Sequence, residues 1–411
     1  MSALPPLLMI PGPVEISPAV AAAAARPPRG HLDPVFIESF GAALGDLRSV
    51  WLAAPGSQSF AVPGGGTLAM EAAATNLVAA GERALVISTG VFGDRMAEML
   101  RRRGAEVEVL AAPPGAAPTA ADAEAALARA VARERPFKAL FATHVDTSTG
   151  VRIAPAGFAR AARRHGALSA FDGVCATAGE RFEMAEWEAD LYFTAAQKAL
   201  GLPPGLALWV AGERALEARR ALPAPPPLSL DWEAWRPVME AYEARRPAYF
   251  STPATTLVAA LAVGLAELLA EAPAAAEAMA RVWSRHERAA RSLRAAFRAL
   301  GLAPVPVSPE LEASTLSALR FPAGRGGELV AAIGARGVAV AGGLHPALAG
   351  TYFRVGHMGS VTRRPEALAR TIAAIAGALA GDGSSAAREA AEAFERSWTE
   401  SAPAAAAGSA R

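Results

Sequence analysis

The sequence predicts an α/β protein in which a large domain with a mostly parallel sheet is followed by a smaller α+β domain. Its 411 residues suit about two or three domains of ordinary size. Between residues 60 and 215, short apolar runs alternate with helical patterns, and beyond residue 302 the two patterns are mixed. We therefore expect an N-terminal arm at residues 1–20, the large domain at 21–272, the small domain at 273–381 and a low-complexity tail at 382–411.

Six short apolar runs predict the sheet of the large domain. Runs of this kind indicate buried parallel strands, because helices cover both faces of such a sheet. Helices are expected between them at residues 67–78 and 155–165, and the second has basic residues in its last turn, as helix ends prefer. The expected strands are residues 84–88, 107–110, 139–143, 168–171, 191–194 and 206–210.

The small domain is predicted from the segments that follow a proline-rich loop at residues 221–227. A helix at residues 257–271 is followed by a longer one, with Leu293, Phe297 and Leu300 on one face, that we expect to bridge the two domains. Beyond it we expect strands at 314–321, 338–341 and 352–355, and helices at 327–334 and 365–379. The tail is expected to hold a short helix at 385–398 and a disordered end.

Charge and cysteine content exclude several classes of function. With 40 basic and 39 acidic residues the formal charge is +1, so no global field attracts a nucleic acid or a charged membrane. The single cysteine, Cys175, allows neither an internal disulfide nor a cysteine-built metal site. The longest apolar stretch, residues 257–266, is far shorter than the ~20 residues that span a bilayer. We expect a cytoplasmic protein with a small-molecule partner and no metal centre.

Lysine is rare in this chain. Lys138 and Lys198 are the two lysines, and the other 38 basic residues are arginines. Arginine stays protonated and cannot form an imine, whereas a partly desolvated lysine can. Each remaining lysine therefore indicates a position where an amine is needed. The alternative is that the low number of lysines is a coincidence.

A glycine-rich segment, residues 63–67, follows a short apolar run and precedes a helix. Gly65 and Gly66 let the backbone approach a ligand closely, the helix start offers free N–H groups, and Thr67 adds a hydroxyl. We call this segment the glycine cup and interpret it as a phosphate site. The alternative is a tight turn with Thr67 as helix N-cap, because the segment lacks a P-loop lysine and a dinucleotide-binding spacing.

Two further candidates follow predicted strands of the large domain. Asp172 comes at the end of an apolar run, where open α/β sheets bind their ligands, and could keep a pyridinium nitrogen protonated. Lys198 follows the next run among small uncharged residues, and desolvation there favours the neutral amine. A helix cap and a surface lysine are the alternatives. Cup, aspartate and lysine together, in this order, indicate a pyridoxal 5'-phosphate (PLP) site.

With these residues the chain resembles a known family, the class V aminotransferases of fold type I, and most closely the alanine–glyoxylate and serine–glyoxylate aminotransferases. The likeness covers roughly residues 8 to 380. Its motifs are Pro-Gly-Pro at 11–13, Gly-His-Leu-Asp-Pro at 30–34, the glycine cup, and the segments 143–150, 172–174, 197–200, 203–205, 249–253, 342–344 and 353–356.

The resemblance implies a role for each matching residue around PLP. It makes Lys198 the residue that forms the internal aldimine, with Asp172 at the pyridine nitrogen. Arg354, in an apolar strand-like run, matches the arginine that binds the substrate α-carboxylate. His345 and His357 lie near it in sequence, and structural histidines are the simpler interpretation.

The remaining matches concern the cofactor and the partner subunit. Phe92 matches an aromatic that stacks on the cofactor ring, Thr147 a hydroxyl residue near its 3-OH, and Val174 a residue on its other face. Tyr249 and Thr252 match a pair that reaches the phosphate from the neighbouring subunit, which implies a homodimer with shared sites. The phosphate ligands are implied to be Gly65, Gly66, Thr67 and Gln197.

The implied reaction is ping-pong transamination of a small L-amino acid, alanine or serine, with glyoxylate or pyruvate as acceptor. Transamination of 2-aminoethylphosphonate with pyruvate, or of ureidoglycine with glyoxylate, stays open as an alternative. A cysteine desulfurase fits less well, because Cys175 lies three residues after Asp172 and not on a mobile loop. A non-catalytic PLP-binding protein also fits less well, since Lys198, Asp172 and Arg354 are all present.

Overall fold

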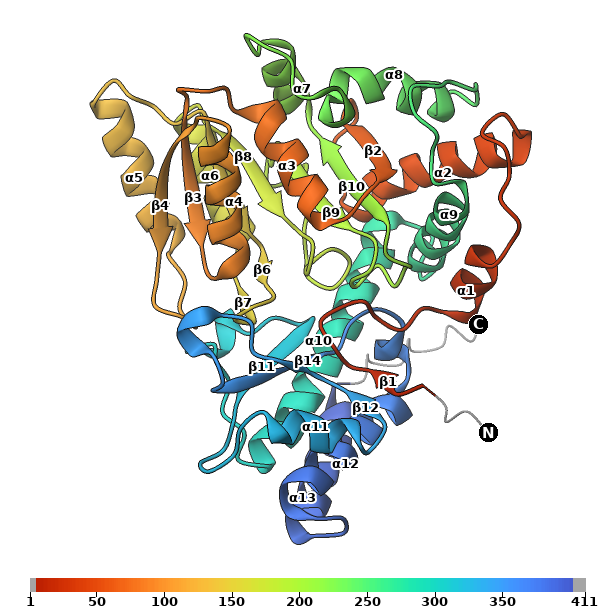
Figure 1. Ribbon diagram of the computed structural model, residues 1–411, viewed down its shortest axis with the longest axis vertical. Helices are drawn as coiled ribbons and strands as arrows, with labels where there is room; N and C mark the ends of the chain where they lie inside the picture. Colours follow the sequence, from red (N-terminus) through yellow and green to blue (C-terminus); the bar gives the residue numbers. More distant parts are fainter. Residues whose placement is uncertain (1–4, 402–411) are drawn as a thin grey trace, which may run out of the picture.

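The computed structural model describes residues 5–401 and has two domains stacked one above the other (Figure 1). The upper, large domain contains a seven-stranded sheet in the order β2-β10-β9-β8-β5-β3-β4. Strand β10 runs antiparallel to both of its neighbours, and the other strands are parallel, which confirms the mostly parallel sheet. The strands are β2 (Gln58–Pro63), β3 (Arg83–Ser88), β4 (Glu106–Ala111), β5 (Ala139–Thr143), β8 (Leu168–Asp172), β9 (Leu191–Ala195) and β10 (Leu206–Ala211).

Each of the six predicted apolar runs forms a strand, and β2 is the strand that the sequence does not predict. Strands β5, β8, β9 and β10 are buried along their whole length, as their continuous apolar runs require. In β2 the apolar stretch is limited to Phe60, Ala61 and Val62, and polar residues precede it. Phe60 stacks on Trp209 of β10 with ring centroids 5.0 Å apart, so β2 is fixed by its packing partner.

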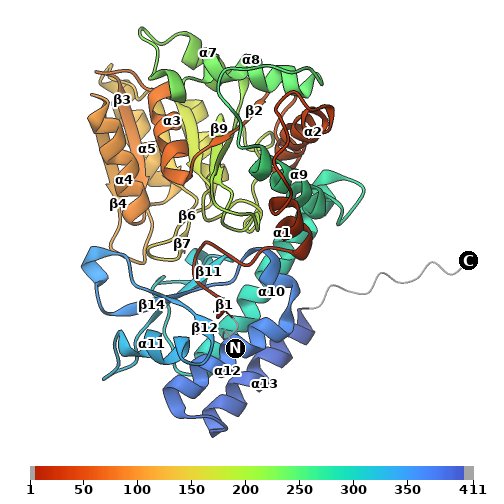
Figure 2. The ribbon, with the colours of Figure 1, turned by 45° about the vertical axis from the view of Figure 1, so that its right-hand side comes forward.

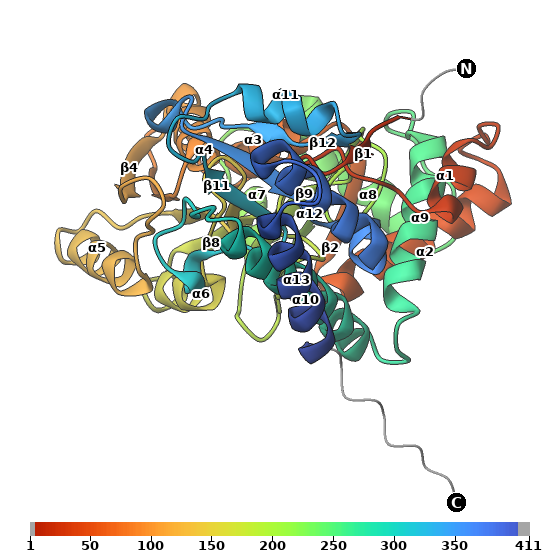
Figure 3. The same ribbon diagram turned by 90° about the horizontal axis from the view of Figure 1, so that it is seen from below.

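Helices cover both faces of this sheet. Helix α3 (Gly66–Leu77) connects β2 to β3 and α4 (Val91–Arg102) connects β3 to β4, toward the β4 edge of the sheet. Helix α5 (Ala120–Ala132) connects β4 to β5 and α6 (Pro155–Arg164) connects β5 to β8, back toward the middle of the sheet. Because crossovers are right-handed, the two pairs lie on opposite faces, as Figure 3 shows from below. The edge at β2 is covered by α2 (Pro34–Val50) and α8 (Trp232–Glu243). Helix α9 (Thr255–Leu269) packs on α2, α1 (Pro18–Ala24) packs on α9, and α7 (Glu213–Arg220) packs on α3 and α8.

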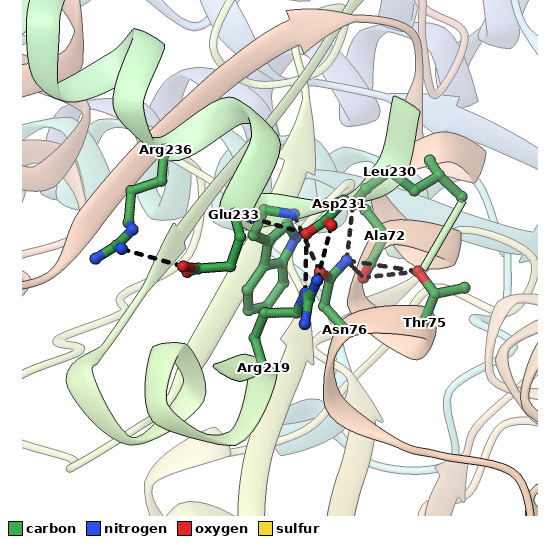
Figure 4. Close-up of polar contacts among 9 residues, drawn as sticks. Ala72, Thr75, Asn76, Arg219, Leu230, Asp231, Glu233 and Arg236 are labelled. Atoms are coloured by element: carbon green, nitrogen blue, oxygen red, sulfur yellow. Dashed lines mark hydrogen bonds and ion pairs between the residues drawn. The ribbon is translucent and has the colours of Figure 1, made fainter. Parts of the chain in front are cut away.

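A buried polar cluster fixes the far end of α3 (Figure 4). The Asn76 side chain donates to the Leu230 carbonyl at 2.8 Å and accepts from the Trp232 backbone N–H at 3.1 Å. Beside it, Arg219 donates to both carboxylate oxygens of Asp231 at 2.9 and 2.7 Å. We call these residues the α3 anchor. Since α3 begins at the glycine cup, the anchor holds in place the helix that presents the cup.

The small domain has its own core around an antiparallel sheet in the order β11-β14-β13. Its strands are β11 (Leu316–Arg320), β13 (Ala341–Gly342) and β14 (Tyr352–Gly356), and β1 (Leu7–Leu8) of the N-terminal arm pairs with β12 (Val338–Ala339). The long helix α10 (Ala275–Ala299) runs between the two cores, as Figure 2 shows. Helices α11 (Glu328–Gly334) and α12 (Pro365–Ala380) complete the domain, and short strands β6 (Val145–Asp146) and β7 (Val151–Arg152) face it from above.

The expected tail contains a packed helix, α13 (Ser385–Glu400). Ala390 and Phe394 are buried in the core of the small domain, and the Arg288 guanidinium of α10 lies 3.9 Å from the Trp398 ring centroid. Residues 385–400 therefore belong to the small domain, in spite of their simple composition. The expected disordered end, from residue 402, lies outside the described residues, and the other domain limits stay predictions. No helix within residues 5–401 is long and apolar enough to cross a membrane.

Candidate active site

The predicted site residues of the large domain, apart from Tyr249 and Thr252, gather at the carboxyl edge of the parallel strands, on the side that faces the small domain. The strand register pairs Thr143 with Asp172 and Asp172 with Phe193, so β5, β8 and β9 end next to one another. A Cβ atom at Gly66 would lie 2.9 Å from Val174 Cγ2 and 3.7 Å from Ala195 Cβ. The cup, Asp172, Val174 and the exit of β9 therefore form one site, as the order of parallel strands predicts.

The glycine cup begins α3. Its N-cap is Gly65, which offers no side-chain hydrogen bond, so the alternative of Thr67 as N-cap is not what the structure has. The close approach to Val174 leaves no room for a side chain at Gly66. The N–H groups of the first helical turn have no partner within the helix, and helix starts of this kind bind anions.

Gln197 supplies an unpartnered polar atom beside the cup. Its Oε1 atom is buried and has no hydrogen-bond partner among the described residues. A buried amide that lacks a partner costs free energy, which a polar ligand recovers. Gln197 follows Ala195, against which the cup lies, by two residues. The unpartnered oxygen needs a donor, whereas the N–H groups of the same amide are the part that donates to an anion at the start of α3.

Asp172 is a buried carboxyl group with few partners. The backbone N–H of Val174 donates to its Oδ1 atom at 2.8 Å. Burial raises the pKa of Asp172 to about 7, and the negative charge of Asp146 acts in the same direction. The charges of Lys198 and Arg95 oppose the shift. A cation placed at this carboxyl group, such as a pyridinium, would stabilise its ionised form.

Lys198 lies beneath the N-terminal arm. Its Nζ atom donates to the carbonyl of Pro11, and a Cβ atom at Gly12 would lie 2.6 to 2.9 Å from the outer atoms of the lysine side chain. Burial lowers the pKa of the Lys198 amine, Cys175 and Asp172 oppose this, and the Arg354 charge adds to it. The neutral amine that a nucleophile or a base needs is therefore favoured here.

Phe92 and Thr147 are connected through the buried carboxyl group of Asp146. Phe92 lies in the first turn of α4, and its N–H donates to Asp146 Oδ2 at 3.0 Å. Asp146 Oδ1 accepts from the N–H and the hydroxyl of Ser148 at 2.9 and 2.5 Å. Thr147 lies between Asp146 and Ser148 in the sequence and is buried. The aromatic ring and the hydroxyl residue are thus fixed relative to each other.

Arg354 lies on β14 and reaches from the small domain to the large one. Its Nε atom donates to the Gly342 carbonyl at 2.9 Å and its Nη1 atom to the Thr147 carbonyl at 3.1 Å. Within residues 5–401 no carboxylate lies close enough to form an ion pair with it. Burial lowers the pKa of the guanidinium, which still stays far above neutral. A partly buried cation without an anion is suited to bind an acidic substrate.

Comparison with known proteins identifies the family. The family model of class V aminotransferases matches residues 49–364. The chain belongs to the class V aminotransferases. This makes it a PLP-dependent aminotransferase with the fold type I architecture.

Similar proteins differ in the amino donor that their names give. Alanine–glyoxylate aminotransferase 1 of Saccharomyces cerevisiae is 33% identical over 369 residues, which cover 86% of this chain and 91% of that protein. L-aspartate–glyoxylate aminotransferase of Paracoccus denitrificans is 33% identical over 359 residues, covering 86% and 87%. The solved structure of ureidoglycine–glyoxylate aminotransferase from Bacillus subtilis has a TM-score of 0.85 at 25% identity and covers 96% of this chain and 99% of its own.

The two histidines near Arg354 have structural partners in this class V aminotransferase. His357 is buried, and its ring nitrogens lie 3.0 Å from the Ser317 hydroxyl and 3.1 Å from the Ser314 carbonyl. Burial lowers the pKa of His357 to about 3, so it stays neutral. His345 accepts from the Ala347 N–H at 3.2 Å, as the cap of a short helix. Neither ring therefore needs a substrate to satisfy it.

Tyr249 and Thr252 are exposed on the loop between α8 and α9. The Tyr249 ring packs against His31 at 5.3 Å between centroids, and 65% of the residue is exposed. Among the described residues, the structure does not bring this pair to the cup of its own chain. Their role stays a prediction that involves a second subunit.

Sequence reasoning missed Arg95 and Asp146. The Arg95 guanidinium lies 4.8 Å from the centroid of the Phe92 ring, and its charge reaches Asp172. The signal for both was present: Arg95 follows Phe92 by one helical turn, and Asp146 stands inside the segment 143–150 that carries the resemblance. Neither residue could be assigned from the sequence, because their partners lie on other elements.

Proposed function

We propose that this aminotransferase holds PLP covalently on Lys198 and moves the amino group of a small L-amino acid, alanine or serine, to glyoxylate or pyruvate. The observation that carries the proposal is the pairing of a desolvated lysine amine with an arginine that lacks an anion. Burial, and to a smaller extent the Arg354 charge, lowers the pKa of Lys198. A carboxylate bound to Arg354 would then be held on the side of the site where this amine lies. Both half-reactions use a 2-amino or 2-oxo acid, and one cation serves both.

The residues around the site suit PLP. The start of α3 with Gly65, Gly66 and Thr67 would hold its phosphate, with the N–H groups of the Gln197 amide as further donors. Asp172 would face the pyridine nitrogen, with Val174 and Phe92 on the two faces of the ring and Thr147 at the 3-OH. Bound there, PLP supplies an electron sink for the pair freed when the substrate Cα–H bond breaks.

Lys198 and Arg354 perform the steps that belong to the protein. The free Lys198 amine would take the proton from the substrate Cα, and the Pro11 carbonyl, which accepts a hydrogen bond from it, would orient it. Arg354 holds the α-carboxylate and so fixes the Cα–H bond relative to that amine. Asp172 in its ionised form would stabilise positive charge at the pyridine nitrogen.

The preferred amino donor depends on which residues contact the substrate side chain. One arginine on the α-carboxylate suits alanine or serine, and the name of the yeast relative supports this. An aspartate donor is a second candidate, favoured by Arg95, a cation above Phe92 whose ion-pair partner is not found among the described residues. The 2-aminoethylphosphonate and ureidoglycine reactions stay alternatives, and the structural neighbour supports the latter.

A homodimer completes the proposed site. Tyr249 packs on His31, and near His31 in sequence two apolar side chains are exposed: Leu32 is 62% exposed and Val35 53% exposed. Exposed apolar groups that gather in this way favour an interface, which would carry Tyr249 and Thr252 to the phosphate of the neighbouring subunit. Gel filtration with light scattering tests this, and a stable monomer that is fully active contradicts it.

A donor screen tests the function. The purified protein loaded with PLP is given alanine, serine, aspartate, 2-aminoethylphosphonate and ureidoglycine, each with glyoxylate and with pyruvate. We expect the largest kcat/KM with alanine or serine and glyoxylate. Turnover confined to one of the other donors replaces the proposed substrate, and a protein that stays inactive and colourless with PLP favours a non-catalytic role. The cytoplasmic location stays a prediction.

A further inference from the structure

Tyr352 and Arg354 stand on the same face of β14, two residues apart, and both reach the large domain. They contact the turn between β6 and β7, residues 147–150, which we call the β6–β7 turn. Arg354 donates to the Thr147 carbonyl of this turn at 3.1 Å, and Tyr352 donates through its hydroxyl to the adjacent carbonyl of Ser148. Two neighbouring carbonyls of one domain thus receive two side chains from the other.

The Tyr352 hydroxyl has a second set of contacts in its own domain. It accepts from the backbone N–H groups of Leu344 and His345, both at 2.8 Å. With one donor and two acceptor sites used, this buried hydroxyl is fully hydrogen-bonded. Leu344 lies just beyond Gly342, whose carbonyl accepts from Arg354 Nε at 2.9 Å.

We propose that Tyr352 is a positioning residue that sets the Arg354 guanidinium for the substrate carboxylate by latching residues 342–345 onto the β6–β7 turn. Each carbonyl that orients Arg354 lies close in sequence to a group that Tyr352 holds: Ser148 follows Thr147 directly, and Leu344 and His345 lie two and three residues after Gly342. A guanidinium has five N–H donors, and these two carbonyls occupy two of them. The donors left on Nη1 and Nη2 form the fork that a carboxylate needs.

The β6–β7 turn is a rigid support for this latch. The Ser148 hydroxyl donates to Asp146 Oδ1 at 2.5 Å and accepts from the Val91 N–H at 3.0 Å. Thr149 donates through its hydroxyl to the Thr89 carbonyl at 2.9 Å. The turn is therefore fixed to the start of α4, and Tyr352 transmits that fixed position to Arg354.

The inference rests on the proposed function of Arg354, and the Tyr352→Phe variant tests it. The substitution keeps the ring and removes the hydroxyl that touches both domains. We expect KM for the amino donor and for the oxo acid to rise about tenfold each, with kcat within about twofold, since the three hydrogen bonds of the Tyr352 hydroxyl are lost and the reacting groups are untouched. In the protein without substrate, amide hydrogen exchange at residues 344 and 345 should accelerate.

A double-mutant cycle with Arg354→Gln separates this inference from the proposed function. If Tyr352 acts through Arg354, adding Tyr352→Phe to Arg354→Gln changes kcat/KM by less than about twofold. If Arg354→Gln alone leaves both KM values unchanged, the proposed function of Arg354 is wrong. If Arg354→Gln raises KM but Tyr352→Phe does not, or if the two effects multiply in full, the positioning role is overturned.

Two further variants guard against a general loss of stability. Thr371→Val removes a buried hydroxyl bonded to the Ala367 carbonyl at 2.9 Å in the small domain, away from the latch, and should leave KM unchanged. Gly343→Ala keeps the Tyr352 hydroxyl but places a methyl group 2.4 Å from the edge of its ring, so the ring must shift. We expect Gly343→Ala to raise KM in the same direction as Tyr352→Phe. Unchanged KM values in a folded Gly343→Ala protein contradict the latch.

Discussion

The carboxyl edge of the sheet and the α3 anchor both contain buried charged residues, but among the described residues these have ion-pair partners only in the anchor. In the anchor, Arg219 and Asp231 form a bidentate pair whose side chains are 8% and 11% exposed. At the carboxyl edge, Asp172 has a single backbone donor, and Arg354 points at carbonyls and not at a carboxylate. A buried charge whose partner belongs to the fold becomes costly when that partner is removed, whereas a charge without one keeps a place for a ligand.

Lysine gives the sharpest form of this comparison. Lys198→Ala should abolish turnover, with a loss above about 10⁴-fold, because the nucleophile and the base are removed together. Lys138→Ala is the matched control, since Lys138 is the other lysine and lies 3.7 Å from Glu82 at the opposite edge of the sheet. Steady-state rates and thermal melting of both variants measure this. Full activity in Lys198→Ala, with its fold intact, contradicts the account.

Asp172→Asn and Asp231→Asn should separate catalysis from stability. Asp172→Asn keeps the shape and removes the charge, so kcat should fall about 10²- to 10³-fold while the free energy of unfolding of the cofactor-free protein does not decrease. Asp231→Asn leaves Arg219 buried without its anion, which should cost about 3–5 kcal/mol of unfolding free energy with KM unchanged. Denaturant unfolding and kinetics measure both. Equal losses of unfolding free energy in the two variants would contradict the distinction between a charge paired within the fold and a charge kept for a ligand.

The pH dependence of PLP binding should follow Asp172. Its pKa of about 7 lies above the ordinary value of 3.8, so the folded chain without cofactor favours the neutral acid, and its stability falls as pH rises from about 4 through 7. A pyridinium needs the ionised carboxylate, and ionisation increases as pH rises toward 7. The Kd for PLP should therefore fall by up to about tenfold for each unit by which pH rises below 7, and should level off above pH 7. Fluorescence titration measures Kd. The same slope in Asp172→Asn assigns the dependence to another group.

Arg95 is expected to have the smallest effect, confined to one class of donor. Arg95→Leu should lower kcat/KM for aspartate about tenfold and for alanine less than about twofold, because only a second carboxylate would meet this guanidinium. The ratio of the two kcat/KM values is the measurement. A ratio equal to that of the unmodified protein means that Arg95 packs on Phe92 and does not select the donor.

The large domain and the cofactor side of the site could be predicted because local signals determine them. The buried runs that form β5, β8 and β9 are continuous in sequence, and parallel strands bring their carboxyl ends together, so Asp172 and Lys198 had to meet. Strand β2 was missed because its apolar core is short and its partner β10 lies far along the chain.

The contacts that orient the reactive groups could not be predicted from local patterns. The Pro11 carbonyl meets Lys198 across 187 residues, and Tyr352 meets Ser148 across 204. Neither pair leaves a periodic or spacing signal, because the contact depends on how the two domains and the arm pack. The packing of α13 was missed for a similar reason: its alanine-rich sequence gives little sign of the partner that buries Phe394.

Borohydride reduction of the PLP-loaded protein, followed by peptide mass spectrometry, tests the central claim most directly. Reduction converts the bond between PLP and a lysine into a stable amine, so the modified lysine can be located. The account predicts one modified residue, Lys198, with Lys138 unmodified, and no adduct in the Lys198→Ala variant. An adduct on Lys138, or no adduct in a protein that is active with PLP, contradicts it.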